Sequence, residues 1–560
     1  MSGFLRPEVM SGADWRALEF SVSRLLLHCG WTDVQNIGGS GDKGADILAA
    51  RYNPKTSATD GYLVQVKAVS GSRYVGKPAI EQAIQGQAHY GADVAVVATN
   101  GDFTKSALLR RDELQEQGFR LRLWNGAFLR DLLENWPEYG AGRRELRNYQ
   151  SNILSELERR HQAGVQKSLV VIATGLGKTV IAARLADSLF RKGLKRVLVL
   201  CHTVDLANQL QQSFWREIGK GISTRLFMGG EPPIPIEGIN FGLYQSLFGY
   251  LGGLEPDAFD LIIVDEAHHA LANAFATCIE HLRPKFLLGM TATPWRGDGA
   301  SIESIFGEAV TRLSLVDGMR MGYLATVDYR LMCDNINWEE IPKLAKTRVS
   351  IRDLNRRLFL PQRDEAVIAV LRDVMTEFED PRIAVFSPSK KHARAFAKKL
   401  VASGIPAANL SVEDKLERRR LLLRFATGKL QAITSVDVLN EGIDVPDVNI
   451  LVFLRATHSR RIFVQQLGRG LRVSEGKTKV VVLDFVTDVR RFSAVAAIGQ
   501  EAKEKPTGDY VETVHLKRGV VALSDLRAGQ FIEEWLEDAA SLEDADDKTM
   551  LVFPSLGEDE

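Results

Sequence analysis

The feature that most constrains this chain is an apolar run that passes through two glycines into a helical pattern. Leu169–Ala173 is almost entirely apolar, which is typical of a buried strand, and beyond it apolar residues recur at helical spacing until Gly193. Glycines at a strand-to-helix turn let backbone N–H groups face an anion, with the helix N-terminus behind them. The turn itself reads Thr174–Gly175–Leu176–Gly177–Lys178–Thr179.

The residues of this turn predict a phosphate-binding loop. We expect Lys178 to reach the β- and γ-phosphates of a nucleotide and the Thr179 hydroxyl to bind Mg²⁺. The strict pattern has glycine where this chain has Ile172, so the loop departs from it at one position. The residues expected to bind ATP here are Thr174, Gly175, Gly177, Lys178 and Thr179.

A second apolar run supplies the other half of such a site. Phe259–Val264 ends directly in two carboxylates, Asp265 and Glu266. We expect Asp265 to take part in binding Mg²⁺ and ATP, and Glu266 to orient or deprotonate the attacking water. The loop and the acidic pair together predict a motor that hydrolyses ATP with Mg²⁺.

Composition sets broader limits. The chain has 560 residues, too many for one core, and this length favours three or four domains. No run of about 18 apolar residues and no N-terminal signal pattern occurs, so we expect a cytoplasmic protein without a membrane partner. The 4 cysteines form no C-x-x-C pair, which argues against a zinc site or a disulfide framework. With 71 basic and 71 acidic residues, the net charge neither supports nor excludes nucleic-acid binding.

Residues 1–137 are interpreted as a separate α/β unit. A helical stripe over 14–29 precedes a glycine-rich loop, and a strand is expected over Tyr62–Ala68, after a Pro/Ser/Thr-rich excursion at Asn53–Gly61. The other expected elements are a helix over 78–90 and strands over 94–98 and 119–124.

Four polar side chains of this unit could carry chemistry. Two-residue alternation places Gln65 and Lys67 on one face of the expected strand. We expect Asp46 to hold Mg²⁺, Gln65 to offer a carbonyl oxygen to the metal, and Lys67 to position a water or stabilise the charged phosphate. Glu19, on the first helix, would add a second carboxylate to the metal site. The simpler alternative, a solvated pair of Asp46 and Lys67 on a strand edge, stays open at this point.

The segments around these residues resemble a known nuclease group. Gly39–Asp46 has the pattern G-x-G-D-x-G-x-D and Gln65–Lys67 has Q-x-K, and both resemble the Mrr-type branch of the PD-(D/E)xK nucleases. The resemblance implies a metal-dependent DNA endonuclease. This chain has Gln65 where most of the superfamily has Glu or Asp, so it offers one negative metal ligand fewer.

Motifs on both sides of the acidic pair resemble those of superfamily 2 helicases over residues 143–490. Ahead of the phosphate loop, the resemblance implies that Tyr149 stacks on the adenine and that Gln150 hydrogen-bonds its edge. Downstream, it implies that Gly442 and Asp444 contact ATP. The other matching segments are Cys201–Thr203, Tyr244–Ser246, Thr291–Pro294, Thr434–Asp437 and Gln465–Arg472.

The last of these motifs, Q-x-x-G-R-G-x-R, presents Arg469 and Arg472. Arginines so spaced are how one lobe offers guanidinium groups to a γ-phosphate bound by the other, where their planar forks stabilise charge on the transferred phosphoryl group. With A-T-G-x-G-K-T and D-E-A-H, this motif makes the resemblance closest to the restriction-enzyme-like helicases, which include type I and type III restriction subunits.

The sequence is less specific elsewhere. Arg348–Arg372 is predicted as a charged helical segment, and Ile383–Phe386 as a strand of a second α/β unit. Phe531–Ala540 could form a short amphipathic acidic helix. The last 20 residues are acidic enough to be a disordered tail or an interaction segment.

The predicted fold is multidomain α/β. A PD-(D/E)xK nuclease-like domain is expected to precede two RecA-like lobes built on parallel sheets. The expected ranges are 1–137 for the nuclease-like domain, 143–318 and 319–490 for the two lobes, and 491–560 for a C-terminal extension with an acidic tail.

The function expected from this arrangement is an ATP-dependent DNA helicase or translocase coupled to Mg²⁺-dependent DNA cleavage, as in a restriction or antiphage-defence effector. The expected partner is double-stranded DNA, whereas a specificity or other defence-system subunit and a homo-oligomer are left open. The main alternative is a repair or remodelling helicase whose N-terminal domain is a catalytically inactive DNA-binding module. An RNA helicase is disfavoured because no RRM or KH motif occurs.

Overall fold

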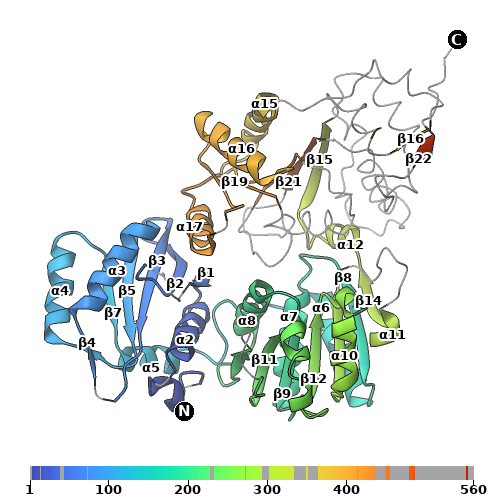
Figure 1. Ribbon diagram of the computed structural model, residues 1–560, viewed down its shortest axis with the longest axis horizontal. Helices are drawn as coiled ribbons and strands as arrows, with labels where there is room; N and C mark the ends of the chain where they lie inside the picture. Colours follow the sequence, from blue (N-terminus) through green and yellow to red (C-terminus); the bar gives the residue numbers. More distant parts are fainter. Residues whose placement is uncertain are drawn as a thin grey trace.

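The computed structural model contains three large β-sheets with helices packed around them (Figure 1), which confirms the α/β class. Within the described part of the chain, no helix is long and apolar enough to cross a membrane. The structure describes all residues except 1–2, 13, 38–42, 72, 228–232, 272, 293–301, 333–347, 351–352, 354–363, 413, 437–447, 455–478, 486–549 and 553–560.

The N-terminal sheet has the strand order β1-β2-β3-β5-β7. β1, β2 and β3 pair antiparallel, whereas β3, β5 and β7 run parallel, so the carboxyl ends of these last three strands meet at one edge. Helix α2 packs against β1, β2 and β3, and α3 packs against β3 and β5. The elements are α1 (Pro7–Met10), α2 (Trp15–His28), β1 (Thr32–Asn36), β2 (Ile47–Asn53), β3 (Ala58–Lys67), β4 (Tyr74–Val75), α3 (Lys77–Tyr90), β5 (Val94–Thr99), β6 (Asp102–Phe103), α4 (Lys105–Glu116), β7 (Leu121–Trp124) and α5 (Gly126–Glu134).

The hairpin between β2 and β3 is tighter than the sequence suggests. β3 begins at Ala58, which pairs with Asn53, so the excursion predicted over 53–61 is wrong and most of that segment is strand. The Pro/Ser/Thr content on which that prediction rests marks only the turn at 54–57. Within the strand, Asp60 is a charged residue with partners in the fold. It is held in the sheet by Arg120, whose guanidinium lies 2.6 Å from its Oδ2, and by the side chain of Asn53 at 2.9 Å.

The second sheet is fully parallel, in the order β10-β11-β9-β12-β13-β8-β14. β13 lies between β8 and β12, so the carboxyl ends of these three strands are neighbours. The elements are α6 (Asn148–Gln162), β8 (Lys167–Ile172), α7 (Lys178–Arg191), β9 (Arg196–Cys201), α8 (Val204–Glu217), β10 (Thr224–Leu226), β11 (Gly238–Leu243), α9 (Tyr244–Phe248), η1 (Leu251–Gly253), β12 (Leu261–Asp265), η2 (Ala267–Leu271), α10 (Asn273–His281), β13 (Phe286–Thr291), α11 (Glu303–Phe306), β14 (Ala309–Leu313) and α12 (Leu315–Arg320).

The third sheet is parallel too, in the order β15-β21-β20-β17-β19-β18. The strand predicted over Ile383–Phe386 is its strand β17. The other elements are β15 (Thr326–Met332), α15 (Asp364–Met375), α16 (Lys390–Ala402), β18 (Ala407–Asn409), α17 (Lys415–Ala426), β19 (Ala432–Ser435), β20 (Ile450–Phe453) and β21 (Lys479–Phe485).

The segment Arg348–Arg372 is not the single helical stretch that its charge pattern suggests. Its first residues form strand β16 (Arg348–Ser350), which pairs antiparallel with β22 (Met550–Val552), and helix α15 begins only at Asp364. The helical prediction is wrong for β16 because its pairing partner lies far along the chain and leaves no local signal. The same pairing places part of the last 20 residues in a strand, whereas Phe531–Ala540 lies outside the described residues.

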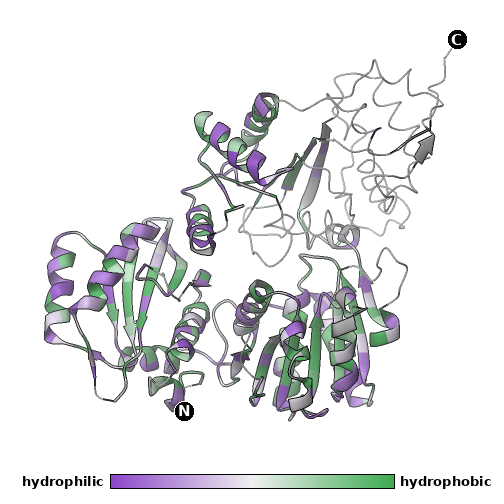
Figure 2. Ribbon diagram, viewed as in Figure 1, coloured by the Kyte–Doolittle hydropathy of each residue, from purple (hydrophilic) through white to green (hydrophobic). Residues whose placement is uncertain are grey.

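Apolar side chains follow the strands of all three sheets. Figure 2 shows hydrophobic colouring concentrated in the strands and hydrophilic colouring on the helices around them. The strands β8, β12 and β13 are buried along most of their length, as parallel strands covered on both faces must be. Polar residues at the ends of these strands, such as Asp265 and Thr291, are therefore exceptions to the apolar pattern.

Gly289 in β13 tests this packing. A Cβ added to it would lie 2.7 Å from the ring atoms Cγ and Cδ1 of Phe306, which is fully buried. We expect Gly289→Ala to destabilise the protein by roughly 1–3 kcal/mol, because the ring or the strand must shift. The measurement is the thermal midpoint, with Gly252→Ala as the control, since a Cβ there meets nothing within 4 Å. Equal midpoints for the two variants would contradict the packing.

Candidate functional site

The connection between β8 and α7 has the backbone shape that the sequence predicts for a phosphate loop. Gly175 and Gly177 have φ angles of +89° and +87°, which side-chain-bearing residues rarely adopt. A Cβ on Gly177 would also lie 2.4 Å from Nε2 of Gln150. Glycine is therefore required at this position both by the backbone conformation and by the space around it.

Two buried polar groups of the loop make few hydrogen bonds within the protein. The Lys178 side chain is buried, and its Nζ donates a hydrogen bond of 3.3 Å to the carbonyl of Ile172. The Thr174 hydroxyl is buried without a hydrogen-bond partner. Buried polar groups are normally paired, so this loop fits an anion that would accept hydrogen bonds from both. Thr179 follows as the second residue of α7 and is half-buried.

The acidic pair lies at the same edge of the sheet. β12 ends at Asp265, and only β13 separates it from β8. Burial, and after it the nearby charge of Glu266, raises the pKa of Asp265 to about 7, although Lys178 acts in the opposite direction. The positive charge of Lys178 does not offset these two effects, and a divalent cation bound here would favour the ionised form of Asp265. The loop and Asp265 together fit ATP with Mg²⁺.

Glu266 is held in an unusual backbone conformation. Its φ is +49°, which costs free energy in a residue with a side chain. Its Oε2 is buried without a hydrogen-bond partner and lies 3.4 Å from Nδ1 of His268. The same Nδ1 lies 3.0 Å from Oγ1 of Thr291, at the end of β13. His268 thus joins the acidic pair to the neighbouring strand, a contact that the sequence motifs do not reveal.

Tyr149 and Gln150 lie against the phosphate loop. The Gln150 Nε2 donates to the carbonyl of Leu176 at 2.9 Å and to the Tyr149 hydroxyl at 3.2 Å, and its Oε1 accepts from the backbone N–H of Arg147 at 3.0 Å. The Tyr149 hydroxyl donates to the same Leu176 carbonyl. Both side chains therefore hold the loop backbone, and their expected contacts with adenine stay a prediction.

An aromatic residue that no sequence motif marks, Tyr323, lies beside Tyr149. The ring of Tyr323, which follows α12, lies 5.0 Å from that of Tyr149. Arg147 lies over the Tyr323 ring at 4.8 Å and donates to its carbonyl at 3.0 Å. The side chains beside the loop are thereby tied to the segment that leads into the third sheet.

The second candidate site lies in the N-terminal sheet. Asp46 and Gln65 are both buried, and Oδ2 of Asp46 accepts hydrogen bonds from the backbone N–H of Val66, at 2.6 Å, and from the Gln65 amide. The Oε1 atom of Gln65 is buried without a hydrogen-bond partner. A carboxylate beside an unpaired amide oxygen is a donor set that suits Mg²⁺, so the residues fit the metal.

The other two residues predicted for this site lie nearby in the fold. Lys67 is half-buried at the end of β3, two residues from Gln65 and so on the same face of the strand. Glu19 is half-buried on α2, which packs against β2 and β3. In the part of the chain that the structure describes, no three His, Cys, Asp or Glu residues gather into a metal-binding cluster. Asp46 and the neutral Gln65 thus form a lightly charged site.

Several predicted functional residues lie outside the described residues. They are Gly442, Asp444, Arg469, Arg472, the start of the glycine-rich loop (38–42) and Thr293–Pro294. Their roles stay predictions.

The fold and the two sites define a class: a nucleotide-binding α/β motor with an attached nuclease-like domain. Comparison with protein families agrees with it. Residues 10–133 match the family described as restriction endonuclease, of the Mrr catalytic type, 143–296 match type III restriction enzyme, res subunit, and 366–474 match the helicase conserved C-terminal domain. The chain therefore combines an Mrr-type restriction-endonuclease domain with the two helicase domains found in restriction-enzyme subunits.

Individual relatives agree with this assignment. A Saccharomyces cerevisiae protein named as an ATP-dependent helicase, IRC3, is 23% identical over 355 residues, which cover 61% of this chain and 51% of that protein. The endonuclease subunit of the Escherichia coli type I restriction enzyme EcoAI is 25% identical over 409 residues, 65% of this chain and 49% of that subunit. The chain thus spans about half the length of these relatives.

One solved structure shares the fold across most of the chain. The ATP-dependent type ISP restriction-modification enzyme LlaBIII, bound to DNA, superposes with a TM-score of 0.50 at 17% identity. The match covers 84% of this chain and 36% of that enzyme.

Replacing Lys178 tests the phosphate loop. We expect Lys178→Ala to lower ATP turnover at least about 100-fold, because the group that meets the phosphates is lost. The melting temperature should change little, since the Nζ contact to Ile172 is a long 3.3 Å hydrogen bond. The control is Lys192→Ala, just after the other end of α7, where the Lys192 Nζ lies 2.7 Å from the Glu158 carboxylate. ATP turnover of this variant should stay within about twofold of wild type. Normal turnover in Lys178→Ala would refute the site.

Proposed function

We propose that this protein is an ATP-dependent DNA translocase or helicase that carries an Mg²⁺-dependent DNA endonuclease and acts in restriction or antiviral defence. The observation that carries the proposal is the presence of two separate sites in one chain. The first is the phosphate loop with Asp265 and Glu266, and the second is the buried pair of Asp46 and Gln65. Double-stranded DNA is the proposed substrate, with a further specificity or defence-system subunit and self-association as open partners, and the cytoplasm is the proposed compartment.

In the proposed motor, the side chains divide the work of hydrolysis. Lys178 and the loop N–H groups hold the phosphates, while Thr179 and Asp265 would hold Mg²⁺, which when bound neutralises charge on the phosphates. Glu266 would orient the water, and its carboxylate lies beside His268, with Oε2 3.4 Å from Nδ1. Tyr149 and Gln150 fix the loop and are proposed to contact the base.

The second lobe is proposed to complete this site. Arg469 and Arg472 would approach the γ-phosphate when the lobes close, with Gly442 and Asp444 at the same nucleotide. The proposed domain ranges remain 1–137, 143–318, 319–490 and 491–560.

In the proposed nuclease site, Asp46 and the Gln65 carbonyl would hold Mg²⁺, which when bound polarises the scissile phosphate. Lys67 supplies a positive charge on the same strand face, where it can position water or stabilise the charged phosphate. Glu19 is the candidate for a second carboxylate.

One observation favours the alternative, in which the N-terminal domain binds DNA without cutting it. The pair of Asp46 and Gln65 carries a single negative charge, and among the described residues it is not part of a group of three or more His, Cys, Asp or Glu side chains that could hold a metal. A site of this kind would hold Mg²⁺ less strongly than the usual pair of carboxylates. The alternative then keeps the motor as a repair or remodelling helicase.

Substitutions in the nuclease site separate the two candidates. Asp46→Ala should remove most of the metal affinity and nearly all DNA nicking, and Lys67→Ala should depress nicking strongly, because each removes a charge at the scissile phosphate. ATP turnover should persist in both, since the motor site is built from other residues. Nicking of plasmid DNA and ATP hydrolysis are measured side by side. Gln65→Glu, which restores the usual carboxylate, should keep some nicking.

The matched control is Asp112→Ala, an exposed carboxylate of the same domain that pairs with Arg111 at 2.8 Å. It should nick like wild type. If wild type nicks and both Asp46→Ala and Lys67→Ala nick equally well, the active site lies elsewhere. If wild type never nicks with ATP and with Mg²⁺ or Mn²⁺, the DNA-binding alternative replaces the nuclease.

A further inference from the structure

The nuclease domain is joined to the first lobe by a buried cation. Arg24 of α2 is 2% exposed, and its guanidinium donates to the carbonyls of Ile222, at 2.7 Å, and Gly219, at 3.0 Å, in the first lobe. It also lies over the ring of Phe4 at 4.4 Å. Burial lowers the pKa of Arg24 to about 9, so it stays charged at neutral pH. Separating the two domains would break both of these charge-assisted hydrogen bonds.

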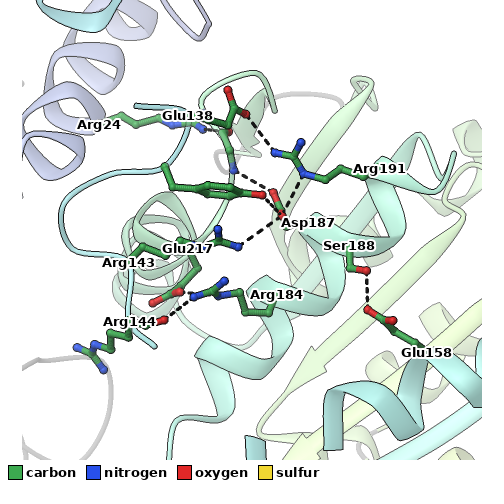
Figure 3. Close-up of polar contacts among 12 residues, drawn as sticks. Arg24, Glu138, Arg143, Arg144, Glu158, Arg184, Asp187, Ser188, Arg191 and Glu217 are labelled. Atoms are coloured by element: carbon green, nitrogen blue, oxygen red, sulfur yellow. Dashed lines mark hydrogen bonds and ion pairs between the residues drawn. The ribbon is translucent and has the colours of Figure 1, made fainter. Parts of the chain in front are cut away.

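The segment that links the two domains strengthens this joint. Lys220 of the first lobe donates through Nζ to the carbonyls of Trp136, at 2.7 Å, and Leu133, at 3.1 Å, at the end of the nuclease domain. Asp187 lies on α7, and Figure 3 shows it beside Arg191. Its carboxylate accepts hydrogen bonds from the hydroxyl of Tyr139, in this segment, and from the N–H of Gly219, both at 2.9 Å. The nuclease domain is thus fixed to the first lobe by several buried contacts.

The nuclease domain also contacts the second lobe, at a different place. Helix α17 packs against β1 and β2, as Figure 1 shows, and Leu423 of α17 is buried in the hydrophobic core of the nuclease domain. Just after α17, Nζ of Lys429 lies 3.1 Å from Oδ1 of Asp93 and donates to the carbonyl of Gly91 at 3.1 Å. We call the contact made by Gly61, Asp93, Leu423 and Lys429 the α17 contact.

The ion pair of the α17 contact is more open to water than the Arg24 contacts that join the nuclease domain to the first lobe. The Lys429 and Asp93 side chains are 40% and 33% exposed, and an ion pair so open to water contributes little stability. Its apolar part centres on Leu423. A movement that has to break one of the two interfaces would therefore break the α17 contact first.

The α17 contact lies on the strand that carries the nuclease residues. Oδ2 of Asp93 accepts a hydrogen bond of 2.7 Å from the N–H of Gly61, in the first half of β3. Gln65 and Lys67 lie at the other end of the same strand. The contact does not cover these residues, so it bears on the position of the nuclease domain and not on access to its site.

We propose that the α17 contact is a latch that opens when the second lobe closes on nucleotide bound to the first, while the nuclease domain stays with the first lobe. This inference rests on the proposed function, because it assumes that the motor works by lobe movement. The lobes of such motors reorient during the ATP cycle. A domain fixed to one lobe and touching the other cannot keep both interfaces when they reorient, and the partly exposed one opens.

Hydrogen–deuterium exchange on the full chain tests the latch, with the protein alone and with duplex DNA and a non-hydrolysable ATP analogue. On adding both, peptides covering 58–67 and 423–429 should exchange about two- to fivefold faster, the range that a partly exposed ion pair supports. Peptides covering 133–139 and 219–222 should stay protected. Lys429→Glu should show the faster exchange even without nucleotide, and its ATP turnover in the absence of DNA should rise. The control is Lys398→Glu, which replaces an exposed lysine of α16 and should match wild type.

Peptides covering 173–179 report whether the analogue binds the phosphate loop. If they become protected while 58–67 and 423–429 keep their protection, the latch is wrong and the motor stands. The latch is also wrong if 219–222 loses its protection, because the nuclease domain then leaves the first lobe. If 173–179 never becomes protected, nucleotide binding itself fails, and the proposed function falls together with the latch.

Discussion

The structure depends on an unbalanced set of charges at the carboxyl edge of the second sheet. The Lys178 Nζ has one 3.3 Å hydrogen bond, to the Ile172 carbonyl, and burial together with the neighbouring charge of Glu266 raises the pKa of Asp265. Both groups would be stabilised by a ligand of opposite charge. An anion would pair with Lys178 in the loop, and a cation would favour the ionised form of the acidic pair. A magnesium nucleotide would supply both, which gives a reason for the strained backbone of Glu266 at this edge.

The candidate metal site of the N-terminal sheet is built in a similar way but carries less negative charge. Asp46 is ionisable and Gln65 is not, and the one unpaired amide oxygen lies next to the carboxylate. The two sites are built on different sheets and share no residue, so a substitution in one site leaves the residues of the other in place. The two sites are connected through contacts between their domains. The buried Arg24 joins the nuclease domain to the first lobe, and the α17 contact joins it to the second.

Local sequence was sufficient wherever a polar motif ends an apolar run. The phosphate loop, the acidic pair and the strand carrying Gln65 and Lys67 lie in elements close to those expected, because buried parallel strands have an unambiguous composition. Contacts between distant residues gave no such signal. Gln150 holds the Leu176 carbonyl, and β16 pairs with β22 across two hundred residues of chain, neither of which a local pattern can encode. Nor does any motif mark Arg24 as the buried residue of a domain joint.

The central claim is that one chain both hydrolyses ATP on DNA and cuts it. The most direct test incubates the wild-type protein with plasmid and with linear duplex DNA, with and without ATP and Mg²⁺, and measures ATP hydrolysis and cleavage in the same reactions. The account predicts hydrolysis that DNA stimulates, and nicking that requires Mg²⁺. Hydrolysis that is absent or does not respond to DNA, or DNA that stays intact in all of these reactions, would contradict it.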